Sequence, residues 1–233
     1  MNASTELESI MGRVITIDGP AASGKTSVSR ELAKRLGWYW VSTGAFYRGL
    51  AYVAQRLDLD LQNESELSEL SKSPVWRVEM AESKTRVYFE DEDVTDEIGR
   101  EDIGNIASKV SHFAKVRAGL LEGQRDCQAR TEGLVAEGRD CGTVVFPKAE
   151  VKIYLTARSE NRAERRAKEQ GLSTESLIEE QNQRDHQDST RKAAPLQIPQ
   201  NAHVVDTTSM DFEQVVLEVE KIVRRQLLQK PKP

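Results

Sequence analysis

A glycine-rich segment near the start of the chain has the residue types that bind phosphate. Small residues and glycines let consecutive backbone N–H groups turn inward around an anion. The segment matches the pattern G-x-x-x-x-G-K-[ST], in which the lysine reaches the β- and γ-phosphates and the threonine hydroxyl is a ligand for Mg²⁺. It therefore predicts a site for a nucleoside triphosphate. Its residues are Gly19, Pro20, Ala21, Ala22, Ser23, Gly24, Lys25 and Thr26.

Arginines are the second chemical feature of the chain. A guanidinium binds phosphate through two parallel hydrogen bonds, and phosphoryl transfer depends mainly on positioning and charge neutralisation. An acceptor that is itself a phosphate needs no general base, because its oxygen is already ionised. The arginines therefore favour transfer to a small phosphorylated acceptor. Those at predicted loops or helix ends are Arg48, Arg139, Arg158, Arg162, Arg165, Arg166, Arg184 and Arg191.

The elements that position these residues begin as an alternation of strands and helices. Residues 14–17 form a β-branched run that is typical of a buried strand. Residues 25–36 have apolar positions at helical spacing, and Gly37 follows where a helix ends. A second strand and helix are predicted at 38–41 and 44–55. This order indicates a parallel α/β sheet, with the glycine-rich segment at the amino end of a helix, where the helix dipole favours phosphate.

The middle of the chain departs from this alternation. Residues 75–80 and 86–89 alternate in polarity on either side of a turn, which predicts an antiparallel insert. One helix is expected from Ile103 to Ala129. The sequence therefore predicts an α/β fold with five parallel strands flanked by helices and one inserted lobe. The remaining strands are expected at 134–136, 151–155 and 203–205, with polar helices at 159–170 and 174–186 and a last helix from about 211.

The composition is that of a globular chain and excludes several classes of protein. The 233 residues carry a net charge of −5, which argues against non-specific nucleic-acid binding. The longest apolar runs have four or five residues, too few for a membrane-spanning helix, and no secretory signal is visible. Cys127 and Cys141 are too few for a disulfide scaffold. We expect a monomeric, cytoplasmic protein with small-molecule substrates and no nucleic-acid or membrane partner.

Several motifs, in order along the chain, resemble those of the bacterial cytidylate kinases, which are P-loop nucleoside monophosphate kinases. The resemblance covers roughly residues 13–228, nearly the whole chain. The motifs are VITIDGPAASGKTS at 14–27, TGAFYR at 43–48, GRDCGTVVFP at 138–147, VKIYL at 151–155 and QRDHQDSTRKAAPL at 183–196.

The resemblance implies one P-loop kinase domain at 13–233, behind a flexible extension at 1–12. Within this domain it implies a nucleotide-binding insert at about 61–103 and a helical lid at about 158–193. The implied core consists of 13–60, 104–157 and 194–228.

The same resemblance implies phosphoryl transfer from MgATP to CMP or dCMP, giving CDP or dCDP and ADP, in pyrimidine nucleotide metabolism. Residues Gly19 to Ser27 and Arg162 would bind ATP, with Mg²⁺ on Thr26. The implied catalytic cations are Lys25, Arg139, Arg184 and Arg191. The acceptor phosphate would lie among Thr43, Arg48, Arg139, Arg184 and Arg191, the cytosine edge would meet Ser108, Arg117 and Asp140, and the ribose hydroxyls would meet Asp188.

Three positions depart from the family pattern. Ser42 stands where an acid commonly precedes Thr-Gly-Ala, and Glu137 stands where an aspartate often precedes Gly-Arg-Asp. Ser189 replaces an arginine that the lid stretch of some members carries. Two alternatives stay open. One is a P-loop kinase for another small acceptor, either a different nucleoside monophosphate or a non-nucleotide alcohol, for which Asp140 would serve as base. The other is a nucleotide-gated binding protein, in which hydrolysis switches the shape of the chain.

Overall fold

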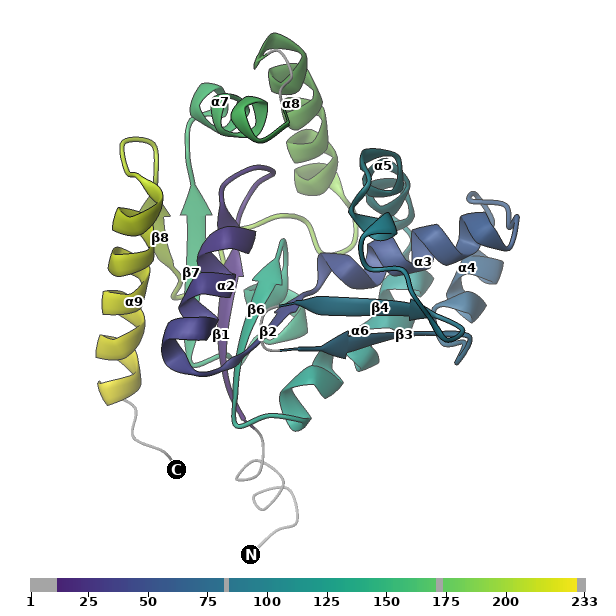
Figure 1. Cartoon of the computed structure of the whole chain (residues 1–233), viewed down its shortest axis with the longest axis horizontal. Coiled ribbons are helices and arrows are strands. Elements are labelled where there is room, and N and C mark those ends of the chain that lie inside the picture. The colour runs from purple at the N-terminus through teal and green to yellow at the C-terminus, as the bar shows by residue number, and fades with distance from the viewer. Residues whose placement is uncertain (1–11, 82–83, 171–173, 230–233) are drawn as a thin grey trace, which may run out of the picture.

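The computed structural model describes residues 12–81, 84–170 and 174–229 (Figure 1). Its centre is a five-stranded parallel sheet, as predicted, and the strands lie in the order β2-β6-β1-β7-β8. Parallel strands bring their carboxyl ends to one edge of the sheet, so the loops that follow them meet there. The strands are β1 Arg13–Asp18, β2 Tyr39–Ser42, β6 Gly133–Gly138, β7 Val151–Thr156 and β8 His203–Asp206.

Helices cover both faces of this sheet, which explains why its inner strands are almost continuously apolar. Successive side chains of β1 point to opposite faces. Ile15 and Ile17 pack under the first helix pair, and Val14 packs under the second, all fully or almost fully buried. The first pair is α2 Lys25–Leu36 and α9 Phe212–Gln229; the second is α3 Gly44–Arg56 and α6 Ala114–Ala129.

A separate antiparallel sheet, in the order β3-β4-β5, lies beside α3 (Figure 1). It contains both predicted strands of the insert and a third that the sequence pattern does not reveal. Gly49 of α3 allows the close approach, since a Cβ there would lie 2.9 Å from the ring of Trp76. Helix α4 was not predicted; Asn63 caps it by accepting from the backbone of Ser65 and Glu66. These elements are α4 Glu64–Leu70, β3 Trp76–Met80, β4 Thr85–Phe89 and β5 Glu92–Asp93.

The prediction of one helix from Ile103 to Ala129 is wrong. After a 3-10 turn, Glu97–Gly99, the chain forms α5 Glu101–Val110 and then α6, with Phe113 in an extended conformation between them. The break leaves the carbonyl of Ser111 to accept from Arg117 at 3.2 Å, and its hydroxyl to accept from Arg191 at 3.2 Å. A continuous helix would have used that carbonyl internally.

Two polar helices, α7 Ser159–Gln170 and α8 Thr174–Thr190, follow β7 as expected. Figure 1 shows them beyond the carboxyl ends of β1 and β7. A π-helical turn, Cys141–Val145, follows β6 at the same edge. Within the described residues, no helix has the length and apolarity that crossing a bilayer requires. Residues 1–11 of the expected N-terminal extension lie outside the described residues.

Candidate active site

The glycine-rich loop joins β1 to α2 and curls around the side chain of Lys25. Gly24 has a φ of 81°, a left-handed conformation that glycine adopts without strain. At Gly19 a Cβ would lie 2.3 Å from the carbonyl oxygen of Leu155, so a larger residue does not fit. Lys25 is buried, and its Nζ donates to the carbonyl of Pro20 at 2.9 Å. The predicted loop is therefore formed, at the amino end of a helix.

The surroundings of Lys25 make its protonated form less stable than it is in water. Burial lowers its pKa to about 7, and the nearby Arg139 acts in the same direction. Glu137, Asp188 and Asp185 act in the opposite direction without restoring the usual value. A bound polyphosphate would supply the missing negative charge and favour the protonated ammonium.

Three hydroxyls of the loop lie close to this lysine in sequence. The Oγ of Ser23 is buried and, within the described residues, has no hydrogen-bond partner. A buried hydroxyl without a partner is unusual and indicates a group that a ligand satisfies. Thr26 and Ser27 are exposed at the first turn of α2, where their hydroxyls are accessible to solvent.

Side chains from α7 and α8 contact the loop directly. Asp185 of α8 accepts from the backbone N–H of Ala21 at 2.9 Å. Arg162 of α7 is buried, pairs with Asp185 at 2.6 Å and donates to the carbonyl of Ala21 at 2.6 Å. The Asp185 carboxylate thus accepts from a backbone N–H of the kind that donates to phosphate in such loops. Asp185 was not predicted, although it follows Arg184 directly.

A cavity of about 500 Å³ opens beside the loop. Its donor side is lined by Ala21, Ala22, Lys25 and Thr26. The structure therefore brings residues from five separate segments to one place. Those that were predicted for the acceptor and line the cavity are Thr43, Arg48, Ser108, Arg139, Asp140, Arg184, Asp188 and Arg191.

Arg117 is the predicted acceptor residue that does not line this cavity. It reaches the site through Asp140, with which it forms an ion pair; the two side chains are 9% and 7% exposed. Its guanidinium also lies 5.3 Å from the ring centre of Tyr47. Burial raises the pKa of Tyr47 to about 12, so the phenol stays protonated. Asp140 is thus the member of the pair at the wall of the cavity, and the Arg117 guanidinium is its buried partner.

Asp188 links two of the predicted cations. It accepts from Arg139 Nε at 2.7 Å and lies 3.8 Å from Arg191 Nη1. Burial alone would raise the pKa of Asp188, but the two guanidinium groups hold it below its usual value. Arg191 is 6% exposed, and its Nε and Nη2 have no hydrogen-bond partner within the described residues. Unsatisfied buried donors at a cavity indicate where an anion would bind.

The other two arginines of the cavity form hydrogen bonds and ion pairs with α5 and with the residues just before it. Arg48 donates to the carbonyls of Ile98 at 2.8 Å and Arg100 at 3.0 Å. Arg184 pairs with Glu101 and donates to Asn105 Oδ1 at 2.6 Å. Glu101 and Ser111 also line the cavity, and neither was predicted. Nothing local marks them, because they become cavity residues only when α5 packs against α3.

Asp18 is a further residue that sequence reasoning missed. This fully buried carboxylate ends β1 and accepts from the backbone N–H groups of Cys141 at 2.8 Å and Gly142 at 2.7 Å. Burial raises its pKa to about 6, and Asp140 adds to the effect while the two N–H groups oppose it. Asp18 therefore ties the strand before the phosphate loop to the turn that carries Asp140.

Two departures from the family pattern meet in the structure. The hydroxyl of Ser42 donates to the carboxylate of Glu137 between the adjacent strands β2 and β6. The Glu137 carboxylate of β6 therefore lies next to Ser42 of β2, the position at which the family pattern commonly has an acid. Thr43 follows Ser42, and its Oγ1 donates to the backbone carbonyl of Glu137 at 2.9 Å.

The family model for cytidylate kinases matches residues 15–225. The chain belongs to the cytidylate kinase family. A cytidylate kinase of Bdellovibrio bacteriovorus is 62% identical over 217 residues, covering 93% of this chain and 100% of that protein. A cytidylate kinase of Aeromonas salmonicida is 41% identical over 222 residues, covering 93% and 96%. An uncharacterised protein of Eubacterium ventriosum has a crystal structure with a TM-score of 0.51 and 11% identity, covering 94% and 99%. That likeness is one of fold alone.

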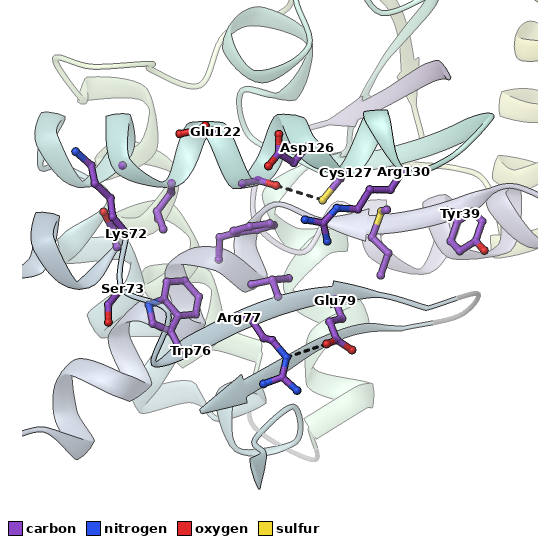
Figure 2. Close-up of a pocket in the computed structure, with 17 residues that line it drawn as sticks. Tyr39, Lys72, Ser73, Trp76, Arg77, Glu79, Glu122, Asp126, Cys127 and Arg130 are labelled. Atoms are coloured by element: carbon purple, nitrogen blue, oxygen red, sulfur yellow. Dashed lines mark hydrogen bonds and ion pairs between the residues drawn. The ribbon is translucent and has the colours of Figure 1, made fainter. Parts of the chain in front are cut away.

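This member of the cytidylate kinase family has a second, larger cavity of about 690 Å³, between β3 and α6. Figure 2 shows Trp76 and Cys127 inside it and the ion pair of Arg77 with Glu79 at its edge. Burial raises the pKa of the Cys127 thiol to about 11, so it is not a nucleophile at neutral pH. Since none of the predicted site residues line this cavity, the smaller one is the candidate active site.

Proposed function

We propose that this protein transfers the γ-phosphoryl group of MgATP to CMP and to dCMP, giving CDP or dCDP and ADP. One observation carries the proposal: a phosphate loop and an arginine-rich pocket open into the same cavity, in a chain of the cytidylate kinase family. The names of the two relatives support CMP as the acceptor. Geometry and family membership together favour this reaction over nucleotide-gated binding.

The donor nucleotide binds at the loop from Gly19 to Ser27. Backbone N–H groups and Lys25 surround the β- and γ-phosphates, and the Thr26 hydroxyl is a ligand for the Mg²⁺ that arrives with ATP. Support for this placement comes from the buried Lys25 ammonium and from the Ser23 hydroxyl that no described residue satisfies. Arg162 holds the loop from α7 through the Ala21 carbonyl. These groups neutralise charge on the transferred phosphoryl group without a proton transfer.

The acceptor phosphate binds on the opposite side of the cavity. Arg191 offers buried donors without partners, and the Thr43 hydroxyl and the guanidinium groups of Arg48, Arg139 and Arg184 complete the site. Their positive charge offsets the repulsion between the two phosphate groups as they approach. The attacking oxygen is already ionised, so the reaction uses no general base.

The Arg117–Asp140 pair and Ser108 recognise the base. The carboxylate of Asp140 accepts from the amino group of cytosine, while Arg117 and Ser108 donate to its ring nitrogen and carbonyl. Uracil has a carbonyl oxygen in place of the amino group and an N–H in place of the ring nitrogen. An acceptor would then face the Asp140 carboxylate and a donor would face another donor, so uracil binds less well. Asp188 accepts from the ribose hydroxyls, and dCMP retains one of the two.

Residues 158–193 act as a lid and residues 61–103 as the acceptor-binding insert. The contacts of Arg162 and Asp185 with the loop support the first assignment, and the position of the antiparallel sheet beside α3 supports the second. We propose that the protein acts as a monomer. Two buried free cysteines fit a reducing compartment such as the cytoplasm.

The test is ADP release with MgATP and a panel of CMP, dCMP, UMP, AMP and GMP. We expect rapid turnover with CMP and dCMP and at least about tenfold lower kcat/KM with UMP. Asp140→Asn should reduce the CMP-to-UMP ratio of kcat/KM, while the exposed control Asp126→Asn should leave it unchanged. Turnover with a different acceptor alone, or acceptor-independent hydrolysis alone, would contradict the proposal.

A further inference from the structure

Helices α5 and α8 meet beside the candidate active site through polar side chains. Arg184 of α8 pairs with the carboxylate of Glu101 and donates to Asn105 Oδ1 at 2.6 Å. Ser108, further along α5, donates to Gln187 Oε1 of α8 at 3.1 Å. The three α5 residues are spaced by four and three positions, so they share one face of the helix. This face forms a bridge between the segment proposed as the lid and the acceptor pocket.

The bridge uses a guanidinium that the proposed function gives to the acceptor. Both Arg184 and Glu101 line the active-site cavity. A carboxylate and a phosphate are ligands of the same kind for a guanidinium, because each accepts charge-assisted hydrogen bonds through two oxygens. Both Glu101 and Asn105 accept from Nη2 of Arg184, so a phosphate that binds through this nitrogen must displace the Glu101 carboxylate.

Among the described carboxylates that pair with cavity arginines, Glu101 is the most exposed. Its side chain is 41% exposed, compared with 10% for Asp188, which pairs with Arg139 and Arg191. When an exposed ion pair breaks, water hydrates the carboxylate again, so the free-energy cost is small. A buried carboxylate loses its partner without regaining water, so the free-energy cost is larger. Glu101 is also the first residue of α5, where the helix dipole stabilises a negative charge whether or not Arg184 is bound. Glu101 is thus the partner that an incoming phosphate displaces most readily.

We propose that Glu101 competes with the phosphate of the nucleoside monophosphate for Arg184, and so raises the acceptor concentration at which the pocket fills. The proposal rests on the proposed function, because it takes the phosphate of CMP as the competing anion. Without acceptor, the Glu101–Arg184 pair holds α8 on α5. When CMP binds, its phosphate takes over Arg184 and Glu101 turns to solvent.

The test is the variant Glu101→Gln, which keeps the shape of the side chain and removes its charge. An exposed ion pair of this kind contributes about 0.7 kcal/mol, so we expect the KM for CMP to fall about threefold. The KM for ATP and kcat should stay close to wild type, and calorimetry without ATP should show the same threefold tighter binding of CMP.

Asp102→Asn is the matched control. Asp102 is the next residue of the same helix, is 46% exposed and pairs with Arg100 at 2.6 Å instead of with α8. It reports the effect of removing one negative charge near the pocket, so KM should stay unchanged in this variant. An unchanged or higher KM in Glu101→Gln, or an equal fall in both variants, would overturn the proposal while wild-type turnover of CMP leaves the proposed function intact. Absence of wild-type turnover with CMP would overturn both.

Discussion

The two sides of the active-site cavity are built from different parts of the chain. The donor side is mainly one loop of consecutive residues that surrounds Lys25, and Arg162 of α7 binds this loop through the Ala21 carbonyl. The acceptor side consists of side chains from α3, α5, α8 and the turn after β6, joined by pairs such as Arg139 with Asp188, 49 residues apart. A backbone-built site is specified by local sequence, whereas a side-chain site depends on how distant elements pack.

Their electrostatics differ in the same way. On the acceptor side, Arg139 and Arg184 each have a carboxylate partner, Asp188 and Glu101. On the donor side, burial leaves Lys25 with a pKa of about 7 and a neutral carbonyl as its hydrogen-bond acceptor. Under the proposed function, Arg139 and Arg184 would exchange one anion for another when substrate binds, whereas Lys25 would gain one. Removing the Lys25 ammonium should consequently lower the activity with CMP more than removing one acceptor arginine.

The variant Lys25→Ala should show the largest effect. Without the ammonium, the charge on the migrating phosphoryl group loses its nearest protein cation, and we expect kcat to fall about 1000-fold, or about 4 kcal/mol of transition-state stabilisation. Steady-state ADP release with CMP measures this loss. Thermal unfolding should be unchanged or shifted upward, because the variant removes a charge that burial disfavours.

Lys34→Ala is the control for this variant. Lys34 lies on the same helix, is exposed, and should leave kcat within about twofold. If kcat of Lys25→Ala stayed within tenfold of wild type, the contrast between the two sides would be wrong, since the donor side would not depend on its cation.

Asp18 connects the two sides, and its titration should be visible in stability. The carboxyl binds its proton more tightly in the folded chain, with a pKa raised from 3.8 to about 6. Its stabilising contribution is therefore complete below pH 4 and is lost as the pH rises through 6, by about 3 kcal/mol in all. In Asp18→Asn this dependence disappears, so the free energy of unfolding of wild type relative to the variant should decrease between pH 4 and pH 7.

Chemical denaturation at a series of pH values measures this difference. Asp91→Asn, at an exposed position of the insert, serves as the control for the removal of one carboxyl group. Parallel curves for wild type and Asp18→Asn would show that Asp18 keeps an ordinary pKa in the folded chain. The linkage between the phosphate loop and the Cys141 turn would then lose its electrostatic basis.

What the sequence reveals follows the same division between local and distant contacts. The loop from Gly19 to Thr26 and the alternating strands were predictable, because each depends on neighbours along the chain. The break at Phe113 was not, since the apolar spacing continues through it. The contact that the broken segment makes with Arg191 joins residues 80 positions apart and leaves no local signal. Glu101 was missed for the same reason, because its partner in α8 is 83 residues distant.

Of Lys25, Asp18 and Arg191, the last gives the smallest expected effect and separates binding from structure most sharply. A guanidinium that gains a phosphate contributes about 2.7 kcal/mol, so Arg191→Gln should lower kcat/KM for CMP about 100-fold while the KM for ATP stays unchanged. Burial lowers the pKa of Arg191, and two of its nitrogens have no partner within the described residues.

A residue with such unsatisfied donors destabilises the fold that contains it, so its removal should leave thermal stability equal or higher. The exposed neighbour Lys192, changed to Gln, should alter neither property. A fall in activity together with a fall in stability would mean that Arg191 holds the fold through Asp188 and Ser111. A fall in activity without a fall in stability would mean that the unpaired donors of Arg191 bind the acceptor. Arg191 would then differ from Arg139 and Arg184, whose charges are paired with carboxylates before the acceptor binds.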